Sequence, residues 1–172
     1  MQLTAAKVLG SDEYRELSHA LNQNEKTDFR NTTFIWMLLY TGARVSEVLA
    51  IRPQDLIDEG MRVFVIGLKN SNDRELPLTP YLFNRMMVLA KDVPADKPIF
   101  GFGYNNARAI WGHYRPKRKK IHSLRHFRAL EVYNKTKDVL LVKYLLGHKN
   151  VNTTMIYLDY AQGQSDMRRA LM

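Results

Sequence analysis

A run of seven apolar residues, FIWMLLY at positions 34–40, constrains the fold of this chain more than any other feature. Thr27 or Asp28 can cap a helix before it, and Gly42 can cap the same helix after it. Because the run is apolar on every side, this helix has to be central, with protein around it. The run is far shorter than the ~20 apolar residues of a membrane span. It therefore predicts a buried core helix and no membrane partner.

Helical patterns fill most of the remaining chain, and one segment has the signals of a β-hairpin. Strand-forming residues at 62–68 and 74–78 flank the turn sequence NSND. The other predicted helices are 12–21, a short one capped by Ser46 and stopped by Pro53, one from Thr79-Pro80 to about residue 91, 105–114, 122–135, 138–146 and 152–161. We expect a single domain over residues 1–172, mainly α with a small antiparallel β-sheet (α+β), ending in a short amphipathic tail, SDMRRALM.

The charge of the chain points to a polyanion as partner. There are 26 Lys and Arg against 17 Asp and Glu, a net charge of +9. A protein that neutralises phosphates gains affinity because condensed counterions are released. The chain has no cysteine, which excludes disulfides, thiolate nucleophiles and Cys-ligated zinc and suits a cytoplasmic location. We see no carboxylates spaced for two-metal catalysis, so we expect neither a metal nor a cofactor.

Half of the residues in one segment are basic. RPKRKKIHSLRHFR, residues 115–128, contains seven Lys or Arg in 14 positions. His122 and Arg125 lie three apart at the predicted start of a helix, where free N–H groups and the helix dipole also favour an anion. The segment therefore predicts a phosphate site, which does not by itself imply catalysis.

Three further positions each allow two interpretations. Arg44 follows the central helix, and Lys69 lies at the mouth of the hairpin. Taken alone, each is more typical of a solvated surface residue. The segment LLGHKNVNTTMIYLDY, residues 145–160, breaks an apolar helix and then presents two tyrosines. It is either a helix corner in the core or the site of a nucleophilic tyrosine.

Four sequence boxes together favour the functional interpretation. TGARVSEVL at 41–49, K-x4-R-x2-P-L at 69–78, HSLRH at 122–126 and LGHKNVNTTMIY at 146–157 have the order and spacing of the tyrosine recombinases, also called the phage integrase family. The chain resembles that family's catalytic domain over about residues 3–157. Carried over by position, the resemblance implies an active set of Arg44, Lys69, His122, Arg125, His148 and Tyr157.

The resemblance also implies a chemistry. The two arginines hold the non-bridging oxygens of a DNA phosphate, and both His122 and His148 bind the same phosphate. Tyr157 attacks to form a 3′-phosphotyrosine, His122 assists the transfer of its proton, and Lys69 protonates the departing 5′ oxygen. Neither metal nor ATP is needed. Tyr160 does not fit the spacing, so we expect it to be a packing or surface residue.

Further contacts and partners follow from the same resemblance. Glu47 is expected to orient Arg44. Contacts to the DNA backbone are expected from the basic segment, namely from Arg115, Lys117, Arg118, Lys119, Lys120 and Arg128. Double-stranded DNA is the expected partner, with a homotetramer on DNA that exchanges C-terminal segments and a monomer or weak oligomer without DNA. We expect the catalytic domain alone, without the helical N-terminal domain that clamps DNA in similar proteins.

Two alternative functions stay open. Type IB topoisomerases use similar residues on a similar core, although the box around His148 and Tyr157 favours a recombinase. A non-catalytic DNA-binding regulator on the same fold would also suit the basic charge. The presence of all six expected side chains argues against that regulator.

Overall fold

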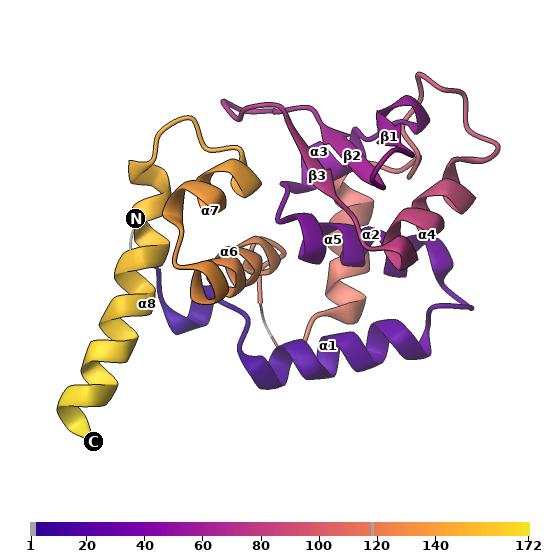
Figure 1. Ribbon diagram of the computed structural model, residues 1–172. Helices are drawn as coiled ribbons and strands as arrows, with labels where there is room; N and C mark the ends of the chain where they lie inside the picture. The colour runs from indigo at the N-terminus through magenta and orange to yellow at the C-terminus, as the bar shows by residue number, and fades with distance from the viewer. Residues whose placement is uncertain (1–2, 118) are drawn as a thin grey trace.

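A computed structural model describes residues 3–117 and 119–172. Figure 1 shows the arrangement of its helices around one small sheet. The helices are α1 (Ser11–Gln23), α2 (Phe29–Thr41), α3 (Val45–Leu49), α4 (Pro80–Ala90), α5 (Tyr104–Tyr114), α6 (Ser123–Thr136), α7 (Val139–Leu146) and α8 (Asn152–Leu171). The strands are β1 (Leu56–Ile57), β2 (Arg62–Val65) and β3 (Arg74–Pro77), and the 3-10 turns are η1 (Ala5–Lys7) and η2 (Pro53–Asp55). The predicted fold class is confirmed.

The sheet has the strand order β1-β2-β3 and is antiparallel throughout. In the predicted hairpin, Val63 pairs with Leu76 and Val65 pairs with Arg74. Val63, Val65 and Leu76 are buried, as the alternation of the two strands requires. Strand β1 was not predicted, because two residues are too few to show a period.

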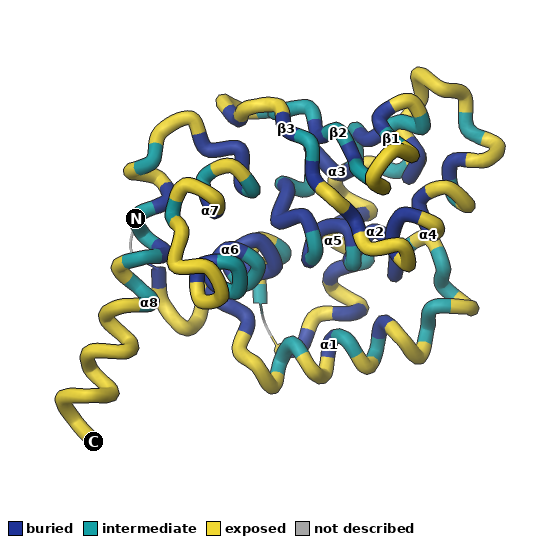
Figure 2. The backbone as a smooth tube through the Cα atoms, in the orientation of Figure 1, coloured by how far each residue is buried: buried dark blue, intermediate teal, exposed yellow. Residues whose placement is uncertain are grey.

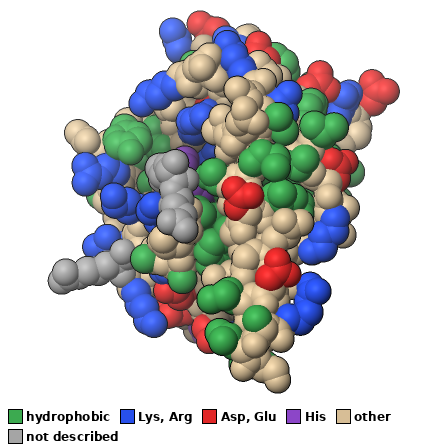
Figure 3. Space-filling view, turned by 90° about the vertical axis from the view of Figure 1, so that its left-hand side faces the viewer, with side chains coloured by type: hydrophobic (Ala, Val, Ile, Leu, Met, Phe, Trp, Pro, Cys, Tyr) green, Lys and Arg blue, Asp and Glu red, His purple; other side chains and the backbone are tan. Residues whose placement is uncertain are grey.

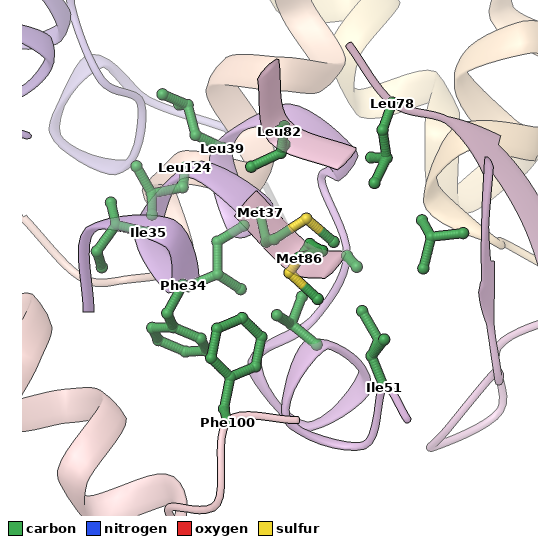
Figure 4. Packing of buried hydrophobic residues seen from close by; sticks show 14 of the residues in the cluster. Phe34, Ile35, Met37, Leu39, Ile51, Leu78, Leu82, Met86, Phe100 and Leu124 are labelled. Atoms are coloured by element: carbon green, nitrogen blue, oxygen red, sulfur yellow. The ribbon is translucent and has the colours of Figure 1, made fainter. Parts of the chain in front are cut away.

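The core helix predicted from the apolar run is α2. Its Phe34, Ile35 and Met37 side chains have no exposed surface, and Figure 4 shows them packed in one apolar cluster. Phe34 meets the edge of Phe100 with 5.3 Å between the ring centroids. Truncating a buried ring of this kind typically costs about 3–5 kcal/mol, so this cluster is a major source of stability. No helix of residues 3–117 or 119–172 combines the length and the apolar character of a membrane span.

A second apolar cluster holds α6, α7 and α8 together. Ala129 and Tyr133 of α6 pack with Val142 of α7 and Tyr157 of α8. Leu145 packs against both clusters, and α6 also lies against α2. In Figure 1, α6–α8 consequently form one side of the molecule, next to the sheet and the other helices.

Two predicted helix boundaries are wrong. Ser46 lies inside α3, and Arg44 occupies the N-cap position, where its backbone N–H donates to the Glu47 carboxylate at 2.8 Å. The tail SDMRRALM is not a separate piece, because α8 continues to Leu171. Figure 2 shows that the end of α8 is exposed on all sides, and every residue after Ala161 is exposed. This part of the helix lacks the apolar face from which a pattern could be recognised.

Candidate active site

Arg44 lies at the start of α3 and faces the loop of the hairpin. Its Nη1 donates to Ser71 Oγ at 2.6 Å and to Glu47 Oε1 at 3.2 Å. Its Nε and Nη2 donate to no residue within the described ranges, and 26% of the side chain is exposed. One edge of the guanidinium is thus fixed by the protein, and the other is available to an anion.

Glu47 is a buried carboxylate that binds two arginines. Besides the contacts with Arg44, its Oε2 accepts a hydrogen bond from Arg74 Nη2 at 2.9 Å. Burial alone would raise the pKa of Glu47, but the charge of Arg74 and the hydrogen bond from the Arg44 backbone outweigh it. The pKa therefore lies below its usual value of 4.5, and the carboxylate is ionised. The contact expected between Glu47 and Arg44 is present.

Arg125 is held by the C-terminal ends of two helices. Its Nη1 donates to the carbonyl oxygen of Gly42, the cap of α2, at 2.7 Å, and its Nη2 donates to that of Leu146, the last residue of α7, at 2.8 Å. Carbonyls at helix ends lack helical partners and carry the negative end of the dipole, so they suit a cation. Burial, followed by the charge of Arg44, lowers the pKa of Arg125 to about 10. The guanidinium is still charged at neutral pH.

Gly147 lets the chain turn sharply at the end of α7. Its φ is +69°, and an added Cβ would lie 2.7 Å from Arg74 Nη1 and 2.8 Å from Ser71 Oγ. The Gly147 carbonyl oxygen accepts a hydrogen bond from Asn72 N at 2.8 Å, and Ser71 forms a β-bridge with His148. The close approach joins the hairpin loop to α7, and glycine is the residue that fits there.

His148 positions Arg125 in this structure. Its Nε2 lies 3.0 Å from Arg125 Nη2, and its Nδ1 lies 2.9 Å from Thr154 Oγ1. Because arginine can only donate, Nε2 is the acceptor and Nδ1 carries the proton that is donated to Thr154. Burial, followed by the charges of Arg125 and Arg44, lowers the pKa of His148 to about 3, so the ring is neutral. The lone pair of Nε2 points at an arginine and not into open solvent.

Tyr157 enters the site from the second turn of α8. Its hydroxyl oxygen lies 3.0 Å from His126 Nδ1, and the residue is 2% exposed. Burial raises the pKa of Tyr157 to about 12, while the charges of Arg125 and Arg44 act in the opposite direction. The charges of both guanidinium groups therefore act on the hydroxyl. Tyr160, in contrast, is half-buried against the second apolar cluster.

His122 lies at the N-cap of α6 with its side chain open to solvent. Its ring meets that of His126 edge-on, with 4.7 Å between the centroids. Partial desolvation in the site, followed by the charges of Arg125 and Arg44, lowers the pKa of His122 to about 4. This ring is therefore neutral at the edge of the arginine pair.

Among the contacts of the described residues, Lys69 makes none with the other predicted active residues. It lies in the turn after β2, in the left-handed region with φ 51°, and its side chain is exposed. The ammonium group makes no hydrogen bond or ion pair with the residues that the structure describes. Ser71, two residues later, accepts a hydrogen bond from Arg44. Lys69 therefore lies at the edge of the site.

Lys119, one of the predicted DNA contacts, is engaged within the protein. Its ammonium donates to the carbonyl oxygens of Ala5 and Val8 at 2.9 and 2.7 Å and pairs with Glu13 at 3.2 Å. Three acceptors match the three N–H groups of a lysine. Lys119 thus holds the N-terminal segment, and it is not among the DNA contacts that we propose.

Arg128 is also engaged. Its Nη1 donates to Glu131 Oε2 at 2.7 Å, and its guanidinium lies over the ring of Tyr40, 4.6 Å from the centroid. These contacts stabilise the side chain against the protein surface. The geometry gives no support to the phosphate contact expected of this arginine.

The remaining part of the basic segment lines an open hollow. Arg115, Lys117 and Lys120 are exposed, and Arg118 lies outside the described residues. A hollow of about 670 Å³ is lined by Tyr104, Arg108, Arg115, Lys120 and His122, among others. On the face shown in Figure 3, Lys and Arg side chains gather along the left margin, and a histidine is visible among them. Within residues 3–117 and 119–172, no group of three or more His, Cys, Asp or Glu is arranged to hold a metal ion.

The sequence has relatives among known proteins. The model of the phage integrase family matches residues 7–163. The chain belongs to the phage integrase family. Among curated members, a tyrosine recombinase of Thermosipho africanus is 32% identical over 168 residues, which are 89% of this chain and 57% of that protein. The tyrosine recombinase XerH of Campylobacter jejuni is 27% identical over 165 residues, 84% of this chain and 47% of that protein. The chain spans about half the length of these relatives.

Solved structures of the phage integrase family share the fold. A structure of the XerH site-specific recombinase bound to palindromic difH substrate has a TM-score of 0.73 at 19% identity, covering 98% of this chain and 54% of that one. The catalytic domain of bacteriophage HP1 integrase has a TM-score of 0.66 at 21% identity, covering 90% of this chain and 88% of that one. This family member therefore shares the fold of these two proteins.

Four side chains in the site of this phage integrase family member were not predicted as functional: Ser71, Arg74, His126 and Thr154. Arg74, His126 and Thr154 stand inside the boxes that carried the resemblance, so the signal was present for all three. Ser71 contacts Arg44 from a distant part of the sequence, and such a long-range pair leaves no local pattern.

Proposed function

We propose that this chain is the catalytic domain of a site-specific DNA recombinase or integrase, which cleaves and rejoins DNA through a 3′-phosphotyrosine. One arrangement carries the proposal: Arg44 through Ser71, and Arg125 through Leu146 and His148, are both held at the end of α7, and the charges of both arginines act on the Tyr157 hydroxyl. Two guanidinium groups beside a nucleophile suit attack on a phosphodiester, because they stabilise the negative charge of the transition state.

The scissile phosphate binds between the two arginines. Arg44 offers Nε and Nη2, which have no partner within the described ranges. Arg125 Nε makes no hydrogen bond with a described residue, while its Nη1 and Nη2 are fixed by the helix ends. Because both guanidinium groups are already fixed by the fold, little reorganisation is needed when the phosphate arrives. His148 contributes by holding Arg125, and His122 lies near enough to bind the same phosphate.

Cleavage is an in-line displacement. The Tyr157 oxygen forms a bond to phosphorus, and the bond from phosphorus to the 5′ oxygen breaks. Lys69 gives a proton to that oxygen, and its free ammonium on an exposed turn can reach DNA held at the arginines. The phosphotyrosine conserves the energy of the broken bond, so a 5′-hydroxyl can reseal the strand without ATP. The residues need no metal for these steps.

Double-stranded DNA lies along the hollow beside His122. Arg115 and Lys120 line this hollow and are exposed, and they contact the phosphate backbone. Lys117, which is also exposed, and Arg118, which lies outside the described residues, are proposed as further backbone contacts. A XerH recombinase of the same fold was solved bound to palindromic difH substrate, which supports DNA as the class of partner here. We propose that recombination on such DNA takes place in the cytoplasm.

On DNA, the chain assembles as a homotetramer through α8. Met167 and Leu171 are 61% and 77% exposed on a helix that extends away from the core. Exposed apolar residues on such a helix are suited to pack on a neighbouring copy. Deleting residues 166–172 should reduce the tetramer fraction on DNA in sedimentation experiments and leave the melting temperature of the free chain unchanged. Unchanged assembly would contradict this part of the proposal.

Covalent selection from a DNA library tests the central proposal. The chain is incubated with nicked duplexes of randomised sequence, in which loss of a short 5′ fragment prevents resealing. Adducts that survive boiling in detergent are isolated, and the attached DNA is sequenced. The proposal predicts adducts through a 3′-phosphate and enrichment of a defined sequence. Relaxation of plasmid without sequence enrichment would favour a topoisomerase, and DNA binding without any adduct would favour a regulator.

A further inference from the structure

His126 contacts the nucleophile, yet the chemistry described above gives it no role. Its Nδ1 lies 3.0 Å from the Tyr157 hydroxyl oxygen, and this hydroxyl makes no other hydrogen bond with the residues that the structure describes. The two residues are 4% and 2% exposed, so the contact is buried. Their rings are tilted at 51° with 5.7 Å between the centroids. A buried imidazole nitrogen is therefore the partner of the reacting oxygen.

We propose that His126 accepts the proton of Tyr157 in the cleavage step and returns it in the resealing step. The inference rests on the proposed function. As Tyr157 attacks, its O–H bond breaks, the proton moves to His126 Nδ1, and the oxygen forms its bond to phosphorus. The 5′ oxygen leaves with a proton from Lys69. In resealing, the imidazolium protonates the departing tyrosine oxygen, while the incoming 5′-hydroxyl loses its proton to Lys69.

The positions of the two histidines on α6 separate their roles. His122 begins the helix, is open to solvent and makes no hydrogen bond with Tyr157 among the contacts of the described residues. His126 lies one turn further along the same face, between His122 and the nucleophile. His122 is thus placed for the phosphate, and His126 is placed for the hydroxyl.

The charges around His126 favour a neutral ring before DNA binds. His122 and Arg125 face it from α6, Lys7 from the N-terminal segment, and Tyr157 from α8. Burial, followed by the charges of His122, Arg125 and Lys7, lowers the pKa of His126 to about 4. The neutral imidazole has one nitrogen free to accept. A phosphate bound at the arginine pair offsets the positive charge, which favours protonation of His126 when substrate is present.

A DNA-free measurement tests the direction of the hydrogen bond. Two-bond ¹H–¹⁵N correlation spectra of the labelled chain at neutral pH report which imidazole nitrogen carries the proton. The signals of His126 are identified by sequence-specific assignment of the wild-type chain, which needs no variant. We expect the proton on Nε2, which leaves Nδ1 as acceptor from Tyr157. A proton on Nδ1 overturns the proposal, because His126 would then donate to the hydroxyl.

Adduct formation tests the proton transfer itself. In His126→Asn, an amide oxygen replaces Nδ1 as acceptor and cannot take up a proton. We expect the rate of adduct formation on a selected nicked duplex to fall by a factor of about 10²–10⁴, with unchanged affinity for intact duplex and an unchanged melting temperature. His19→Asn, on the exposed surface of α1, is the matched control and should keep the wild-type rate. A wild-type or faster rate in His126→Asn overturns the proposal.

A modified substrate separates His126 from the general acid. If sulfur replaces the bridging 5′ oxygen, the leaving group needs no proton. Lys69→Ala should then recover most of its rate, and His126→Asn should not. Recovery in His126→Asn contradicts the assignment. If the wild type forms no adduct on any duplex, the proposed function fails, whereas the tautomer of His126 still decides the direction of this hydrogen bond. If His126→Asn does not fold, that tautomer decides alone.

Discussion

Arg125 Nη2 donates a hydrogen bond of 2.8 Å to the carbonyl oxygen of Leu146, which ties the start of α6 to the end of α7. The same guanidinium holds the cap of α2 through Gly42. Three of the four sequence boxes therefore meet at the Arg125 side chain. The positions of the two helix ends determine how its guanidinium group is oriented. Residues that shape those helix ends should affect catalysis even though they do not touch DNA.

Gly147→Ala tests this dependence. The substitution places a Cβ 2.7 Å from Arg74 Nη1 and retains a left-handed backbone, which for a non-glycine residue costs about 1–2 kcal/mol before any clash. We expect the free energy of unfolding in urea to fall by at least that amount, together with the rate of adduct formation. Gly163→Ala is the matched control, because an added Cβ there meets nothing within 4 Å, and it should gain up to about 1 kcal/mol. Equal stability of the two variants would contradict the close packing.

Arg125→Lys keeps the positive charge but replaces the planar guanidinium group and its several N–H donors with a single ammonium group. One ammonium cannot replace the contacts to Gly42 and Leu146 while also binding a phosphate. Leaving one buried carbonyl unpaired costs about 1–3 kcal/mol of unfolding free energy, and loss of a preorganised donor lowers the cleavage rate about 10²–10³-fold. Arg15→Lys, on the exposed surface of α1, should change neither. Retained cleavage in Arg125→Lys would mean that the arginine is structural only.

Glu47→Gln has an expected pH dependence. The pKa of Glu47 lies below 4.5 in the folded chain, so its ionised form stabilises the fold above that pH. The contribution is lost as the pH falls through the lower folded value. Removing the partner of buried Arg74 should cost about 3–5 kcal/mol at neutral pH. Urea unfolding from neutral pH to below 4.5 should show the difference between wild type and variant shrinking. A difference that is constant over this range would exclude an ionised Glu47 as its source.

Lys69→Ala separates chemistry from stability. The side chain is exposed and has no partner among residues 3–117 and 119–172, so the unfolding free energy should change by no more than about 0.5 kcal/mol. The rate of adduct formation should fall, because the 5′ oxygen leaves without a proton donor. An unchanged rate on an oxygen-containing substrate would remove Lys69 from the mechanism.

Much of the fold could be predicted from the sequence because the decisive signals are local. Gly42 and Gly147 end their helices in the left-handed conformation, and Asp138 and Thr79 cap theirs through side-chain oxygens. The exposed half of α8 could not be predicted, because its residues are exposed and show no buried face from which a periodic pattern could be recognised. The start of α3 was misplaced because a serine normally outranks an arginine as N-cap, whereas here the Glu47 carboxylate satisfies the backbone.

The site was predictable to the extent that it follows sequence boxes. The boxes indicated which residues to bring together, and the structure joins Arg44, Arg125, His148 and Tyr157 through direct contacts or charge. The boxes did not indicate which side chains of the basic segment are bound within the protein. Lys119 binds Glu13 and the carbonyls of the N-terminal segment, which are over a hundred residues away. The pair of Arg128 with Glu131 has the i,i+3 spacing of a helix, so sequence alone could have indicated it.

The most direct test of the proposed function identifies the residue that carries the DNA. Adducts formed on a selected nicked duplex are digested with nuclease and protease, and the modified peptide is sequenced by mass spectrometry. The account predicts a 3′-nucleotide on Tyr157, with adducts lost in Tyr157→Phe and retained in Tyr160→Phe. An adduct that survives Tyr157→Phe, or that maps to Tyr160, would contradict it.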